Sequence, residues 1–266
     1  MTDARSVLSD LVAEQAALDA VVAPLGDDQW ALPTPSPRWT VAAQIAHLAY
    51  FDDAAAMAIA DPERFSRQRD ALFAAAADGD EGVDRFTLEP ARSMRPPDLL
   101  RNWRQARRRL AEAAADLGED DRVEWYGPSM GAKSFLTARL MECWAHGQDI
   151  VDTVRVIRPA TDRLRHIAQL GVITRRWTYL NRGAEPPEGE IRVELTAPSG
   201  DHWTWGPDDA DGRVTGPALD FCLVVTQRRH LDDTDVEATG EIARDWLEQA
   251  QAFAGPPTDG PQAGRF

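Results

Sequence analysis

The chain has 266 residues, of which 43% are hydrophobic and 27% charged, and its formal net charge at pH 7 is -15. This composition is typical of a globular protein with enough apolar residues for two cores. A strongly negative surface repels phosphate, so nucleic acids and anionic membranes are excluded as expected partners. The chain contains no run of 18 apolar residues and no apolar signal core near its start. We therefore expect a cytoplasmic protein.

The cationic residues are almost all arginine, because Lys133 is the one lysine among 29 cationic side chains. Together with the heavy use of alanine, proline, glycine and aspartate, this bias indicates a GC-rich genome, as in actinobacteria. The cysteines, Cys143 and Cys222, are far apart and belong to no CxxC pair. They do not predict a disulfide framework.

The first half of the chain predicts four amphipathic helices. The first is expected over residues 4–23, and Thr40 suits the N-cap of a second helix that ends near residue 60. The polar region 61–94 is expected to be irregular, with a short helix around residues 71–77. The third helix is expected after Pro96 and Pro97 and before Gly118, and the fourth over residues 132–155, ahead of Pro159. Helices in this arrangement are typical of a bundle.

The second half alternates between helix and strand patterns. A linking helix, three strands and two further helices are expected over residues 162–181, 191–196, 202–205, 213–215, 218–227 and 241–253. The sequence thus predicts an α+β protein with a four-helix bundle over 1–160, a smaller α/β domain over 161–255 and a loose tail over 256–266.

One group of residues indicates metal chemistry. Glu142 and His146 lie four residues apart in the fourth helix and Asp149 lies three further on, so all three share one helical face. His47, in the apolar stripe of the second helix, can supply a third ligand across the bundle. Two imidazoles and one carboxylate suit zinc, or iron, cobalt or nickel, and leave coordination positions open. Asp149 is expected to accept the second ring proton of a ligand histidine.

Two stretches carry a resemblance to a known family. WTVAAQIAHLAYFD (residues 39–52) and RLMECWAHGQDI (residues 139–150) resemble the DinB-like superfamily of metal-binding bundles. Within it the chain looks most like the mycothiol-dependent maleylpyruvate isomerase family, over roughly residues 5–253. The resemblance implies a DinB-like bundle joined to a smaller α/β domain, with zinc held by His47, Glu142 and His146. The family often has a Gly-Arg pair where this chain reads TQRR (residues 226–229).

The resemblance implies mycothiol as a thiol cosubstrate. Zinc with an open position lowers the pKa of a bound thiol, which suits isomerisation of a small electrophilic substrate or thiol transfer to it. Arg228 and Arg229 either clamp an anionic substrate or simply complete a helix. The alternatives are a thiol-independent Lewis-acid enzyme for hydration, hydrolysis or cyclisation, a non-catalytic metal-dependent ligand-binding protein, and a bundle without metal. We expect a monomer or homodimer.

Overall fold

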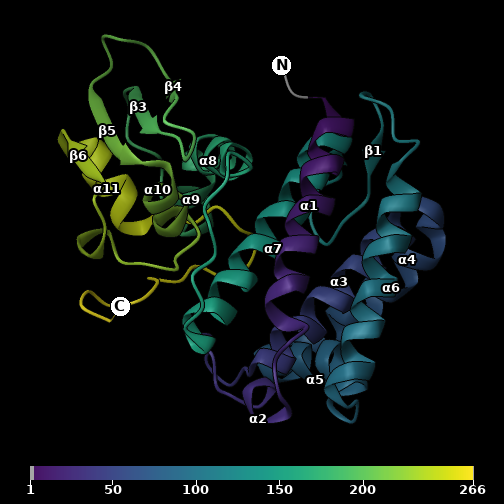
Figure 1. Cartoon of the computed structure of the whole chain (residues 1–266). Coiled ribbons are helices and arrows are strands. Elements are labelled where there is room, and N and C mark those ends of the chain that lie inside the picture. Colours follow the sequence, from purple (N-terminus) through teal and green to yellow (C-terminus); the bar gives the residue numbers. More distant parts are fainter. Residues whose placement is uncertain (1–2, 266) are drawn as a thin grey trace. The chain divides into compact units, whose positions relative to one another are not determined.

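The computed structural model describes residues 3–265 and divides the chain into two compact units, Met1–Ile157 and Arg158–Phe266 (Figure 1). The first unit is helical apart from one small hairpin, and the second combines helices with a four-stranded sheet. The predicted α+β class is confirmed. The division falls three residues before the expected end of the bundle at residue 160. Within the described residues, no helix is long and apolar enough to cross a membrane.

Four long helices form the bundle of the first unit. They are α1 (Ala4–Val22), α3 (Val41–Ala60), α6 (Pro96–Ala114) and α7 (Ala132–Val154). Helix α3 packs against α6 and α7, and α1 packs against α7 and α6. Each contributes fully buried apolar side chains, among them Leu11, Leu48, Trp103 and Leu136. Burying a leucine side chain contributes about 1.5–3 kcal/mol, so this core holds the four helices in fixed register.

The boundaries of the bundle helices follow from local chemistry. Thr40 is the N-cap of α3, as predicted, because its hydroxyl accepts the backbone N–H of Ala43 at 3.2 Å. Helix α6 begins at Pro96, in agreement with the sequence. Helix α7 ends where Arg155 takes up a left-handed conformation with φ 57°, four residues before Pro159.

The region 61–94 was predicted to be mostly irregular, and this prediction is wrong. It forms α4 (Pro62–Ala75), the short 3-10 helix η1 (Ala76–Asp78) and α5 (Gly79–Arg92). The Asp61 carboxylate caps α4 by accepting the backbone N–H of Arg64 at 3.0 Å. The apolar stripe is sparse, with Phe65 and Leu72 as the buried side chains of α4. A helix with so few buried apolar residues is mostly polar in sequence, so the 3.6-residue apolar period that would predict it is weak.

A short helix and a small hairpin complete the first unit. Helix α2 (Asp27–Trp30) lies in the proline-bearing loop before α3. Strands β1 (Arg122–Val123) and β2 (Met130–Gly131) pair antiparallel in the segment between the third and fourth predicted helices. This hairpin leads directly into α7.

The second unit begins with two helices in place of one. Helices α8 (Leu164–Ile173) and α9 (Arg175–Asn181) are separated at Thr174, whose hydroxyl donates to the carbonyls of Leu170 and Gly171. A side chain that bonds back to its own helix in this way competes with the backbone and ends the regular turn. The expected single helix over 162–181 is therefore corrected.

The sheet of the second unit has the order β4-β3-β5-β6. Strand β3 (Ile191–Thr196) pairs antiparallel with β4 (His202–Trp205) and parallel with β5 (Gly212–Pro217), and β5 pairs antiparallel with β6 (Glu237–Thr239). The first three strands were predicted. Strand β6 was missed, since three residues are too few to show alternation.

The remaining elements of the second unit are α10 (Ala218–Val225), η2 (Leu231–Asp233) and α11 (Glu241–Gln249). The segment that was expected to be a loose tail makes defined hydrogen bonds. The backbone N–H of Thr258 donates to Gln251 Oε1 at 3.2 Å, and that of Gly264 donates to the Asp233 carboxylate at 2.8 Å. These contacts attach the end of the chain to the second unit.

Candidate metal centre

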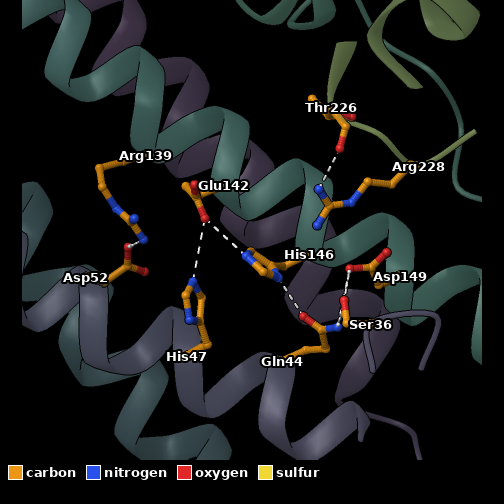
Figure 2. A network of polar contacts seen from close by, with 10 residues as sticks. All are labelled: Ser36, Gln44, His47, Asp52, Arg139, Glu142, His146, Asp149, Thr226 and Arg228. Atoms are coloured by element: carbon orange, nitrogen blue, oxygen red, sulfur yellow. Dashed lines mark hydrogen bonds and ion pairs between the residues drawn. The ribbon is translucent and has the colours of Figure 1, made fainter. Parts of the chain in front are cut away.

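The three predicted ligands meet inside the bundle. His47 lies on α3, and Glu142 and His146 lie one turn apart on α7 (Figure 2). Oε2 of Glu142 is 3.1 Å from Nε2 of His146 and 3.5 Å from Nε2 of His47. Their three ligand atoms lie within 4.8 Å of one another. Bonds of about 2.1 Å at tetrahedral angles place the ligands of a zinc ion about 3.4 Å apart, so these spacings fit such an ion.

The protonation of two of these groups suits metal binding. Burial and the neighbouring His146 lower the pKa of His47 to about 4, so its imidazole is neutral at neutral pH. Burial raises the pKa of Glu142, but hydrogen bonds and charge attraction from His146 and His47 outweigh this and hold it well below its ordinary value. Glu142 is therefore ionised. A neutral imidazole and a carboxylate are the forms that coordinate a cation.

Gln44 was not predicted as a site residue, and it lies directly behind His146. Its Oε1 is 2.5 Å from Nδ1 of His146, and its Nε2 is 3.3 Å from Oδ2 of Asp149. The same Asp149 oxygen accepts the hydroxyl of Ser36 at 3.0 Å. Gln44 is thus the neighbour of the second ring nitrogen of His146. Asp149 had been expected in that position. Asp149 contacts the amide of Gln44, one residue farther out from the ring (Figure 2).

Aromatic rings surround the imidazoles. Trp39 lies with its ring centroid 4.9 Å from that of His47 and stacks on His146 at 5.7 Å. The ring centroid of Phe51 lies 4.6 Å from that of His47. The indole N–H of Trp39 donates to Asp84 Oδ1 at 3.2 Å, which fixes the ring. These rings exclude water from the sides of the two histidines.

Trp125 and Tyr126 lie in the segment between β1 and β2. Both rings pack with Phe65 of α4, Trp125 stacked at 5.5 Å and Tyr126 edge-on at 5.3 Å. Both also contact Phe51, which touches His47. They belong to an aromatic cluster that is continuous with the wall of the candidate metal centre.

The two predicted substrate-binding arginines belong to the second unit. Arg228 and Arg229 follow α10, where Gln227 has a left-handed φ of 58°. Nη1 of Arg228 donates to the Thr226 carbonyl at 2.8 Å, and Nη1 of Arg229 donates to the Arg228 carbonyl at 2.7 Å. These bonds fit the interpretation that they complete a helix, and the substrate-binding role stays a prediction.

One signal in the sequence could have identified Gln44. It stands three residues before His47 among apolar residues of the second helix, and it is completely buried. A glutamine at such a position needs polar partners, because an unpaired buried amide is costly. Trp39 and Ser36 carried no comparable signal, since both precede the helix in a loop.

Each of the two units contains a match to the sequence model of a known family. The sequence model described as the mycothiol maleylpyruvate isomerase N-terminal domain matches residues 11–151, which include all three candidate ligands. A second model, described as wyosine base formation, matches residues 187–239 of the second unit.

Comparison with individual proteins gives relatives in sequence and in structure. Two uncharacterised proteins from two strains of Mycobacterium tuberculosis are 49% identical over 260 residues, which is 98% of this chain and 100% of theirs. Crystal structures of the mycothiol-dependent maleylpyruvate isomerase and of a mutant of it match with a TM-score of 0.55 and 17% identity. The match covers 90% of this chain and 95% of those chains, and it shows a shared fold.

Proposed function

Because the chain belongs to the family of the mycothiol maleylpyruvate isomerase N-terminal domain, we propose that it is a metal-dependent enzyme that activates a thiol. The metal is zinc, the thiol is mycothiol, and the reaction is isomerisation of a small electrophilic substrate or transfer of the thiol to it. The match to this family and the fold shared with the mycothiol-dependent maleylpyruvate isomerase support mycothiol and isomerisation.

The observation that carries the proposal is the convergence of two imidazole nitrogens and one carboxylate oxygen within 4.8 Å. This donor set suits zinc, and three protein ligands are typical of catalytic sites that keep a position open. A bound divalent metal with an open position lowers the pKa of a thiol or water there and so supplies a nucleophile at neutral pH.

The residues of the chain prepare this site in three ways. His47 and Glu142 are already neutral and ionised, respectively, at neutral pH, so neither has to release a proton before it binds a metal. Trp39 and Phe51 flank the imidazoles and exclude water there. The side chains of the three ligands are only 11–24% exposed, so charges in the site interact more strongly than they would in water.

We also propose that Arg228 and Arg229 hold an anionic part of the substrate or thiol. A guanidinium group binds a carboxylate through two parallel hydrogen bonds, which gives both affinity and orientation. Orientation of this kind places the electrophilic carbon for attack. Asp149 supports the ligand histidine through Gln44.

The test is metal analysis of the purified protein, followed by titration of mycothiol into a cobalt-substituted sample. We expect one equivalent of zinc, and a change in the cobalt absorption spectrum when thiolate sulfur enters the coordination shell. His47→Ala, Glu142→Ala and His146→Ala should each abolish stoichiometric metal. His202→Ala, which removes an exposed histidine from the second unit, is the matched control and should keep it.

The other outcomes separate the alternatives. Equal metal content in the wild type and all three variants would refute the metal site. Metal without a spectral response to thiol, together with turnover at full rate in the absence of thiol, would replace the thiol mechanism by Lewis-acid chemistry. Metal and thiol binding without turnover of maleylpyruvate or other electrophiles would indicate a binding protein.

A further inference from the structure

We propose that Gln44 is a positioning residue that keeps a proton on Nδ1 of His146 and so directs the lone pair of Nε2 toward Glu142 and the metal. The inference deepens the proposed function and rests on it in one respect, namely that a metal receives this lone pair. The assignment of the ring proton itself follows from hydrogen-bond geometry alone.

The first step is the orientation of the Gln44 amide. Three oxygens surround its Nε2: Thr34 Oγ1 at 2.9 Å, Ser36 Oγ at 3.1 Å and Asp149 Oδ2 at 3.3 Å. The hydroxyl of Thr34 donates to the Trp39 carbonyl, and the hydroxyl of Ser36 donates to Asp149. Both hydroxyl protons are therefore in use, and a carboxylate has none to give.

All three oxygens can thus only accept from Gln44. The NH₂ group must face them, because the reversed amide would place its own oxygen against three acceptors. The side chain is completely buried, so no bulk water is available to relieve such a conflict. The amide oxygen must consequently face His146, where it lies 2.5 Å from Nδ1.

The second step is the protonation of the imidazole. An amide oxygen has no proton to donate, so the short contact requires a proton on Nδ1 of His146. In the neutral ring the lone pair then lies on Nε2, which is the nitrogen 3.1 Å from Glu142 Oε2. The ligand histidine is thereby fixed in the form that binds a cation on the side of His47 and Glu142.

Gln44 is needed because Glu142 favours the opposite arrangement. In the absence of a cation, a carboxylate 3.1 Å from Nε2 attracts a proton onto that nitrogen. A proton there occupies the position of the metal, and it must leave before the metal can bind. The hydrogen bond to Gln44 offsets this preference, and Asp149, Ser36 and Thr34 hold Gln44 in place.

The experiment compares Gln44→Met with the wild type. Methionine has a similar length and fills the buried site, but it cannot accept a hydrogen bond. Long-range ¹H–¹⁵N NMR of the histidine rings, assigned with a His146→Gln sample, identifies the nitrogen of His146 that carries the proton in zinc-free and zinc-loaded protein. We expect a proton on Nδ1 in the wild type under both conditions, and its loss in zinc-free Gln44→Met. The zinc affinity of Gln44→Met should fall about 10–100-fold, measured against a competing chelator.

Gln15→Met is the matched control. Gln15 is also buried in the bundle and also donates to a carboxylate, Asp52 Oδ2 at 3.0 Å, but it does not belong to the candidate metal centre. This variant should leave the His146 signal and the zinc affinity unchanged.

Two results would overturn the inference. One is an unprotonated Nδ1 of His146 in the wild type. The other is a Gln44→Met protein that keeps both the Nδ1 proton and the wild-type zinc affinity. If the wild type binds no zinc at all, the proposed function fails, while the ring signals of the zinc-free protein still decide the role of Gln44.

Discussion

The bundle contains two buried polar clusters that share helices α3 and α7 and differ in how their charges are balanced. We call them the Asp52 cluster, made of Gln15, Asp52, Trp103 and Arg139, and the metal cluster, made of His47, Glu142 and His146. The first unites one residue from each of the four long helices, and the second unites two helices.

In the Asp52 cluster every carboxylate oxygen has a donor. Oδ1 of Asp52 accepts from Arg139 at 3.0 Å, and Oδ2 accepts from Gln15 at 3.0 Å and from Trp103 at 3.2 Å. Burial raises the pKa of Asp52, and the adjacent Arg139 opposes that rise. A negative and a positive charge meet in the core, so the carboxylate is balanced within the protein, although Nε of Arg139 has no hydrogen-bond partner in the described part of the chain.

In the metal cluster, by contrast, the carboxylate faces two imidazole nitrogens instead of a guanidinium group. Oε2 of Glu142 faces Nε2 of both histidines, and no arginine or lysine pairs with it in an ion pair among the described residues. The negative charge of this group is balanced when a cation binds there, either a proton or a metal ion. The comparison separates a cluster that stabilises the fold from one that is arranged to bind, although both are buried and both contain a carboxylate.

The largest expected difference between the clusters is in stability. Asp52→Ala leaves Arg139 as an unpaired buried charge and should lower the free energy of unfolding by about 3–5 kcal/mol. Glu142→Ala in the metal-free protein should lower it by about 1 kcal/mol, because it removes hydrogen bonds from a partly exposed site. Urea unfolding in the presence of a chelator measures both. Equal losses would show that the two clusters do not differ as described.

The second prediction concerns acid. His47 has a pKa of about 4 in the folded protein against an ordinary value of 6.5, so the unfolded chain takes up the proton first as the pH falls. The metal-free protein should therefore lose about 3 kcal/mol of stability between pH 7 and pH 4 through this group. The lowered pKa of Glu142 acts in the same direction, whereas the raised pKa of Asp52 acts against it.

Urea unfolding at a series of pH values measures this loss. His47→Gln should show a shallower decline in stability toward pH 4 than the wild type does. A slope that does not change in this variant would contradict the assignment of acid sensitivity to the metal cluster.

The sequence predicted the metal cluster better than the Asp52 cluster for a physical reason. Glu142 and His146 are four residues apart on one helix, and helical geometry alone makes them neighbours. Asp52 and Arg139 are 87 residues apart, and their pairing depends on how α3 and α7 pack. No local pattern indicates such a contact.

The difference between local patterns and contacts that depend on packing also explains which helices and strands were predicted. The long helices and the first three strands of the sheet have periodic apolar patterns, and these were predicted. Helix α4 was predicted only in part, as a short helix around residues 71–77, and α5 was missed, because their cores consist of a few side chains, such as Phe65 and Leu88. The position of Gln44 behind His146 also depends on packing between helices, so the sequence placed Asp149 there instead.

A smaller effect is expected from Asp149→Asn. An asparagine keeps the size of the side chain but offers both a donor and an acceptor, so it no longer fixes the orientation of Gln44. Zinc affinity should fall about 10-fold, and activity should weaken while most of the metal stays bound. Competition with a chelator gives the affinity, and a loss of metal as complete as that of His146→Ala would show that Asp149 binds the metal directly.

The smallest effects are expected from the arginines of the second unit, in contrast to Arg139 of the Asp52 cluster. Arg228→Ala and Arg229→Ala remove side chains that donate to nearby backbone carbonyls, so each should change stability by less than about 1 kcal/mol and leave the metal content unchanged. If they hold an anionic substrate, at least one of them should raise KM about 10-fold for maleylpyruvate, since a hydrogen bond to a charged group contributes about 1.5–3 kcal/mol.

Arg139→Ala should instead destabilise the bundle as strongly as Asp52→Ala does, because it breaks the same buried ion pair. Turnover kinetics together with urea unfolding of the three variants distinguish the two kinds of arginine. An unchanged KM in both Arg228→Ala and Arg229→Ala would leave these residues with the helix-completing role that their backbone contacts already describe.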